Sequence, residues 1–340
     1  MRVALRAATR ISVVVVAVVV VLGVAVPPLW TVAPWVPFLV GVVLGVPHGA
    51  VDHLVPWWTA VRSRSWPALA ALLAGYVGLG VAAFAAARVW PVPALLAFLT
   101  SSIVHFGTAE SAVAALREAR PRRPGLRARI AATATGLAAG ATVVVVPLAA
   151  WPATVRPVLL ALAPGIGPLL DSGWSPWALA AVGVADAAAL VSLALRARWV
   201  DAGELALLAA LFLVVPPLPA FAVYFGAWHG LRHLLRLAAT DPANTTDLAR
   251  GRFARPVGRL ARHTALPTLT VLAALVTIWT VPTLADRVAP GLVASALALV
   301  FALTVPHLVV VALLDRRQLR AVAAASSGRP HPAPDRSGQG

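Results

Sequence analysis

The sequence predicts an all-α fold, a polytopic bundle of about ten transmembrane helices with a histidine-lined core. Hydrophobic residues make up 60% of the 340 positions and charged residues 12%, with a mean hydropathy of +0.86. A soluble domain usually carries about 25% charged residues, and a disordered chain needs low hydrophobicity, so both classes are excluded. The apolar residues fall in runs long enough to cross a bilayer, and six of the eight histidines lie inside those runs.

The net charge of +16 comes from 28 basic residues, every one of them arginine. These arginines gather in short gaps between apolar runs, as in the cytoplasmic loops of membrane proteins. That placement argues against nucleic acid as a partner, although a strongly basic chain can otherwise suggest one. The absence of cysteine excludes disulfides and thiolate metal sites. A protein-bound metal would therefore need histidine, carboxylate or backbone oxygen ligands.

The first apolar run follows three arginines and precedes no small-residue cleavage site, so we expect a retained first span. Ten runs suit membrane spans: 11–27, 36–58, 67–87, 94–116, 130–150, 176–195, 203–217, 219–239, 264–284 and 290–314. Residues 154–170 are also apolar, but prolines and glycines interrupt them. Because backbone that spans a membrane must be hydrogen-bonded internally, we expect this segment to be interfacial or re-entrant.

Basic and neutral gaps alternate along these ten runs, and the basic ones include the stretches 117–129 and 236–262. By the positive-inside rule this alternation places both termini in the cytoplasm. The chain is thus expected to be a multi-pass protein of the cell membrane, surrounded by lipid. Residues 1–320 would form one integral membrane catalytic domain. The Pro-, Gly- and Ser-rich residues 321–340 are expected to form a disordered cytoplasmic tail.

Six histidines occur within the second, fourth, eighth and tenth runs, which all cross the membrane in the same direction. Counted along each helix at 1.5 Å per residue, they occupy a slab roughly 10 Å deep on the cytoplasmic side of the midplane. Ionisable residues inside spans are costly and mark functional sites. Histidines at one depth on different helices can meet in the core of one bundle. The six histidines are His48, His53, His105, His229, His233 and His307.

The spacing of individual histidines refines this expectation. His229 and His233 are four residues apart on one helix face, as a shared metal requires, although two unrelated polar contacts would give the same spacing. In the second run, Asp52 lies one turn from His48 and suits a carboxylate that orients a metal-binding imidazole. His53 is five residues from His48, so it points elsewhere and is the weaker candidate.

Two further positions keep alternatives open. Glu110 lies five residues after His105, and it suits either a carboxylate behind a metal ligand or a surface acid. His307 suits a fifth ligand, a hydrogen-bond donor behind a ligand, or a core histidine with satisfied nitrogens, and the last two are favoured. Four neutral imidazoles without thiolates suit Fe(II), and by ligand type also Zn, Cu or Ni.

Four motifs together resemble the Brp/Blh family of bacterial and archaeal β-carotene 15,15′-dioxygenases. They are PHGAVDH at 47–53, HFG at 105–107, WHGLRH at 228–233 and PHLVVV at 306–311, and the resemblance covers residues 35 to 315. It implies a membrane enzyme that uses non-haem Fe(II) and O₂ to cleave all-trans-β-carotene centrally into two retinal molecules, which would serve a rhodopsin. It implies that the catalytic iron ligands are His48, His105, His229 and His233.

Three alternatives remain beside this resemblance. The first alternative is a related oxygenase that acts on another carotenoid or apocarotenoid, because an Asp is more typical of the family at the position of Glu110. A His-lined transporter or proton relay is the second, but it would need a polar path to both membrane faces, and the outer halves of these runs are apolar. The third is a membrane di-iron desaturase or hydroxylase, which would be expected to carry more histidines, including adjacent ones (HH), and the sequence has no HH pair.

Overall fold

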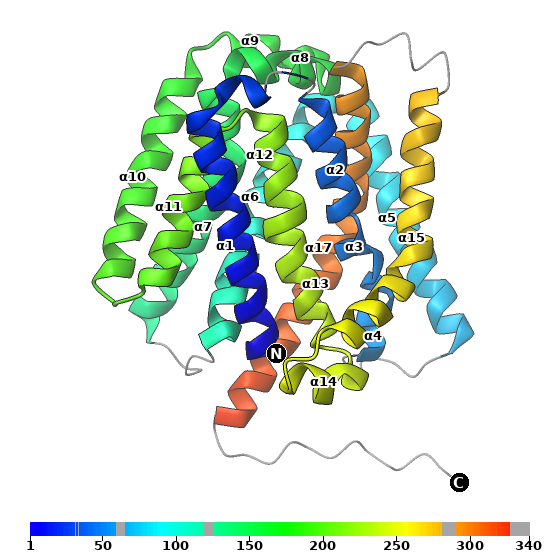
Figure 1. The fold of residues 1–340 in the computed structure, drawn as a ribbon. Coiled ribbons are helices and arrows are strands. Elements are labelled where there is room, and N and C mark those ends of the chain that lie inside the picture. The colour runs from blue at the N-terminus through cyan, green and yellow to red at the C-terminus, as the bar shows by residue number, and fades with distance from the viewer. Residues whose placement is uncertain (31, 33, 59–64, 119–124, 281–289, 327–340) are drawn as a thin grey trace.

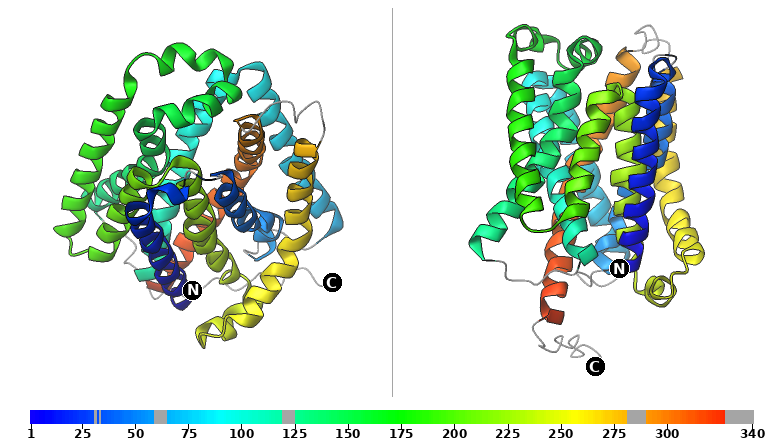
Figure 2. Two further views of the ribbon diagram at one scale, coloured as in Figure 1. Left: turned by 45° about the horizontal axis from the view of Figure 1, so that its top comes forward. Right: turned by 60° about the vertical axis from the view of Figure 1, so that its left-hand side comes forward.

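The computed structural model describes residues 1–30, 32, 34–58, 65–118, 125–280 and 290–326. Regular secondary structure in these residues is helical throughout, which confirms the predicted all-α bundle. Long helices lie side by side along one common axis (Figures 1 and 2). Burial of their facing sides produces a core of mainly aliphatic residues between the helices.

Seven helical segments are long and apolar enough to cross a membrane, so the chain is a membrane protein. Most are single helices, whereas the second consists of α2 (Trp35–Gly45), α3 (Pro47–Ala50), η2 (Asp52–Leu54) and α4 (Val55–Trp58). The other six are α1 (Arg2–Ala25), α5 (Trp66–Val89), α6 (Pro91–Glu118), α7 (Leu126–Ala150), α10 (Trp174–Ala194) and Ala296–Gln318 within α17 (Pro290–Ser326).

The three remaining predicted spans are also helical and lie in the same bundle (Figure 1). They are α11 (Trp199–Val214), the continuous series α12 (Pro217–Val223), η4 (Tyr224–Gly230) and α13 (Leu231–Ala238), and α15 (Ala254–Thr280). The first two carry buried charged side chains, because they contribute polar residues to the interior. The total of ten spans stays a prediction.

The interrupted segment 154–170 forms short helices instead of a span. These are α8 (Pro152–Leu162), η3 (Pro164–Ile166) and α9 (Gly167–Leu170), and they lie across one end of the bundle (Figure 1). The N-terminus and the last turns of α17 lie at the opposite end (Figures 1 and 2). Both described ends of the chain are therefore on one side, as the alternation of arginines predicts.

Two polar segments were predicted to lie outside the bundle. α17 continues as a helix to Ser326, and residues 327–340 of the predicted tail lie outside the described residues, so the boundary after residue 320 stays a prediction. Arg117 and Arg236 were counted among loop charges, yet both side chains are buried in ion pairs between helices. These two charges therefore lie between the helices of the bundle and not in its loops.

Pairs of glycines four residues apart let neighbouring helices approach closely. A Cβ on Gly45 of α2 would lie 2.1 Å from the Phe225 ring, and one on Gly140 of α7 would lie 2.0 Å from the Ile103 carbonyl oxygen of α6. Small residues at such interfaces are typical of packed membrane helices. The repeated pairs are Gly41 and Gly45, Gly136 and Gly140, and Gly226 and Gly230. The first and third pairs bring the second span close to η4, which carries His229, and the second pair packs α7 against α6, which carries His105.

Candidate metal centre

The second span loses regular helical structure at its histidines. A break at Val46 precedes the one-turn α3 with His48, and the 3₁₀ turn η2 then carries Asp52 and His53. Pro47 at the start of α3 cannot donate a backbone hydrogen bond, which explains why the helix does not run through. Irregular backbone at this depth is typical of a functional site enclosed by protein.

The eighth predicted span has a π-helical turn where its first histidine lies. Tyr224–Gly230 (η4) is π-helical, and α13 follows directly. Such turns are rare and occur frequently at functional sites, because they widen the helix and re-aim side chains. Across this junction the rings of His229 and His233 are parallel within 9°, with centroids 6.1 Å apart. The prediction that both imidazoles share one face is confirmed.

Five of the six predicted intramembrane histidines form one cluster of rings. His48 has ring centroids at 5.1 Å from His229, 5.6 Å from His233 and 5.0 Å from His307. His105, on α6, lies 5.1 Å from His229 and 5.3 Å from His307. All five side chains are at most 6% exposed. The structure therefore brings together residues from four separate spans at one depth.

The cluster offers ring nitrogens that suit a metal ion. One ligand atom each of His48, His229 and His307 lies within 4.8 Å of the others, and ligands on opposite sides of a metal with bonds of about 2.1 Å are separated by about 4.2 Å. The Nε2 atoms of His229, His233 and His307 are buried without a hydrogen-bond partner among the described residues. Because unpaired buried nitrogens are unfavourable, a bound cation would explain this arrangement.

The other ring nitrogens of two cluster members are held by hydrogen bonds. His48 Nδ1 bonds the Gly45 carbonyl oxygen, and His307 Nδ1 lies 2.7 Å from Asp52 Oδ2. Either bond places the proton on Nδ1 and leaves Nε2 as an acceptor for a metal. Asp52 was expected to share a helix face with His48, but the structure pairs it with His307 instead. The break in the helix re-aims the Asp52 side chain toward α17.

Two residues predicted to lie near the metal ligands, His53 and Glu110, contact other partners instead of the histidine cluster. His53 Nδ1 lies 3.1 Å from the Ala50 carbonyl oxygen, and no ring contact joins His53 to the cluster within the described part of the chain. Glu110 was proposed either to orient an imidazole or to lie at the surface. It is instead enclosed, and it accepts hydrogen bonds from Trp228 Nε1 at 2.9 Å and Arg232 Nη1 at 3.0 Å.

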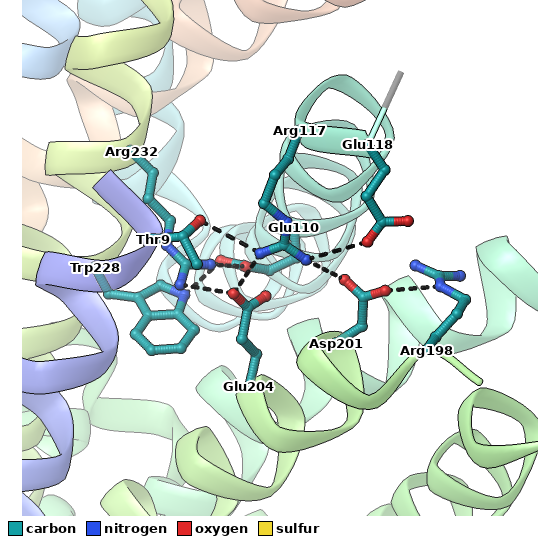
Figure 3. Close-up of polar contacts among 9 residues, drawn as sticks. All are labelled: Thr9, Glu110, Arg117, Glu118, Arg198, Asp201, Glu204, Trp228 and Arg232. Carbon is teal, nitrogen blue, oxygen red and sulfur yellow. Dashed lines mark hydrogen bonds and ion pairs between the residues drawn. The ribbon is translucent and has the colours of Figure 1, made fainter. Parts of the chain in front are cut away.

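Glu110 belongs to a buried ionic network that joins α6, α11 and α13 (Figure 3). Arg232 also bonds Glu204 at 3.2 Å, and its guanidinium carbon lies 3.7 Å from the centroid of the Trp228 ring. Glu204 and Asp201 of α11 each lie 2.6 Å from Arg117 at the end of α6. These contacts give Arg232 a structural role between two acidic partners.

Aromatic side chains surround the histidine cluster. The Phe225 ring lies 5.1 Å from His48, while the Phe106 ring lies 5.1 Å from His229 and the Tyr224 ring 5.9 Å from it. Phe225 stacks on Phe221 at 5.3 Å, which extends the aromatic surface along α12. The rings are therefore surrounded largely by aromatic side chains, and their polar partners include Asp52 and the Gly45 carbonyl oxygen.

Sequence reasoning missed three features of this site. Tyr76 of α5 donates a hydrogen bond to Asp52 at 3.1 Å, and it is a polar residue within an apolar run. The paired glycines could have predicted the close helix contacts, since their spacing of four residues is visible in the sequence. The ion pairs of Arg117 with α11 had no local signal, because the two helices are far apart along the chain.

Comparison with known proteins identifies the family of the chain. Residues 39–315 match the family described as beta-carotene 15,15′-dioxygenase. The chain is 34% identical over 316 residues to a Halobacterium salinarum protein described as probable beta-carotene 15,15′-dioxygenase Blh, covering 87% of this chain and 88% of that protein. No solved structure matches the chain. The chain therefore belongs to the β-carotene 15,15′-dioxygenase family of oxidoreductases.

Proposed function

We propose that this protein cleaves all-trans-β-carotene at its central 15,15′ double bond with O₂, giving two retinal molecules. The observation that carries the proposal is the cluster of buried imidazoles in an otherwise apolar membrane bundle, in a chain of this family. The proposed ligands of a catalytic Fe(II) are His48, His105, His229 and His233.

The donor set fits this metal. Neutral imidazoles suit Fe(II), and an ion held only by histidines keeps positions open for O₂. When bound, the iron would supply the activation of O₂. The chain would hold the imidazoles neutral through burial and through the Nδ1 hydrogen bond of His48, and the surrounding helices would exclude water from the reacting double bond.

The surroundings of the cluster suit a hydrocarbon polyene. Phe106, Tyr224 and Phe225 contact the histidine rings, and apolar and aromatic linings are typical of sites for such ligands. A carotenoid dissolves in the lipid around the helices and would reach the centre from there. We propose a multi-pass location in the cell membrane with both termini in the cytoplasm, and release of retinal for a rhodopsin.

Expression in bacteria that accumulate β-carotene tests this function. We expect loss of the orange colour and two retinal molecules for each β-carotene consumed, as measured by chromatography. His229→Ala should abolish retinal formation and lower the iron content of the purified protein. His263→Ala is the matched control, because His263 is exposed on α15 outside the cluster. Absence of retinal from well-expressed, iron-loaded protein would refute the substrate assignment.

Parallel assays separate the alternative substrate. The same purified protein would be given β-carotene, a hydroxylated carotenoid and an apocarotenal, each with O₂, and the products would be compared. Faster cleavage of the apocarotenal than of β-carotene would favour the related oxygenase with a shorter substrate.

A further inference from the structure

His307 is as central to the ring cluster as the residues proposed above to bind iron. Its ring centroid lies 5.0 Å from His48, 5.3 Å from His105 and 5.4 Å from His233. It also shares with His48 and His229 the group of ligand atoms within 4.8 Å of one another. An ion bound by the proposed four histidines would therefore lie within reach of His307.

The two ring nitrogens of His307 have opposite surroundings. Nδ1 is bonded to Asp52, whereas Nε2 is buried and has no hydrogen-bond partner among the described residues. A core histidine with satisfied nitrogens would not leave Nε2 in this state. The contacts thus oppose the interpretation of His307 as a core histidine with satisfied nitrogens, and they support the first of its three alternatives, a fifth metal ligand.

Asp52 anchors His307 as carboxylates anchor metal-binding imidazoles in other sites. Its side chain is 2% exposed, and Oδ2 receives hydrogen bonds from His307 Nδ1 at 2.7 Å and from the Tyr76 hydroxyl at 3.1 Å. These three residues come from η2, α5 and α17, so three helical segments fix the direction of one imidazole. A buried carboxylate needs a compensating positive charge, which a divalent cation behind His307 would supply.

We propose that His307 is a further ligand of the metal, and that Asp52 and Tyr76 are positioning residues that hold its ring. This inference rests on the proposed iron centre and extends its ligand set from four imidazoles to five. Five imidazoles would then hold the ion, and the iron would supply the activation of O₂. The aromatic and apolar side chains around the rings would place the polyene.

The test compares metal binding in the full chain purified in lipid nanodiscs and reconstituted with Fe²⁺ without oxygen. The measured quantities are the iron content per chain, the iron affinity by chelator competition and the number of imidazoles from X-ray absorption. We expect five imidazoles in the wild type and four in His307→Ala. Asp52→Asn should lower iron affinity by about 10–100-fold, and His307→Ala by at least as much. His53→Ala is the control and should match the wild type.

Each outcome distinguishes the inference from the proposed function. Wild-type protein that takes up no iron would overturn the iron centre, and the ligand role of His307 with it. Iron-loaded wild type with four imidazoles, or a His307→Ala protein with wild-type affinity while His229→Ala loses iron, would overturn only the role of His307. If His307→Ala fails to fold, Asp52→Asn decides, because it keeps the side-chain shape, and unchanged affinity in that variant would reject the inference.

Discussion

The Glu110 carboxylate of α6 lies 3.0 Å from the Arg232 guanidinium of α13 (Figure 3). Arg232 stands between His229 and His233 in the sequence, and its guanidinium also contacts the Trp228 ring. The pair therefore links α13 to α6 next to the turn that carries His229.

Removal of the Arg232 charge is expected to destabilise the bundle. Arg232→Ala would leave the buried acids Glu110 and Glu204 with one cationic partner fewer, and breaking such a pair costs about 3–5 kcal/mol. Arg232→Lys should be intermediate, because an ammonium cannot satisfy two carboxylates in the same fork geometry. The free energy of unfolding of both variants can be measured in mixed micelles with an increasing fraction of a denaturing detergent. Equal stability of Arg232→Ala and the wild type would contradict this role.

A double-mutant cycle on Arg117 and Asp201 should give a large coupling energy. The two side chains are 6% and 8% exposed at a distance of 2.6 Å, so solvent screens them little. We expect coupling above about 1 kcal/mol. The matched control is Arg156 with Asp171, which are 2.7 Å apart but 41% and 64% exposed, so solvent screens them and their coupling should be much smaller than that of the buried pair. Similar coupling for both pairs would show that burial is not decisive.

Gly45→Ala should disturb the metal centre through Phe225. The new Cβ would lie 2.1 Å from the Phe225 ring, which itself packs 5.1 Å from His48. Forced repacking of this kind costs about 1–3 kcal/mol, and we expect weaker iron binding as well. Gly75→Ala is the control, since its Cβ would meet no atom within 4 Å. That variant should be neutral or stabilised by up to about 1 kcal/mol in thermal unfolding. Unchanged iron affinity in Gly45→Ala would argue against the close contact.

Iron should raise the thermal stability of the purified protein. A ligand present at 100 times its Kd stabilises the folded state by about 2.7 kcal/mol if it binds only that state. We therefore expect a lower Tm after chelation and recovery on addition of Fe²⁺. His229→Ala should have a Tm that does not respond to Fe²⁺, whereas His263→Ala should respond as the wild type does. An unresponsive wild type would indicate that the cluster does not bind iron.

Several properties of the protein follow from its sequence alone. The apolar runs predict the helical membrane bundle, because their lengths match the thickness of a bilayer. The positions of the histidines along those runs predict their common depth, since each residue advances a helix by about 1.5 Å. Spacing of four residues likewise predicts that His229 and His233 share a face.

Only the tertiary structure decides which side chains meet across helices. Asp52 could contact His48 by helical spacing, but the helix is interrupted between them at Val51, and Asp52 pairs with His307, which is 255 residues away in the sequence. Glu110 could have faced the imidazoles or the surface, and the rotation of α6 against α13 places it with Arg232 instead. The physical reason is that spacing along the sequence determines the depth of a residue and the helix face on which it lies. Its partners on other helices depend on how those helices are rotated and how closely they pack, and the sequence does not specify which helices lie side by side.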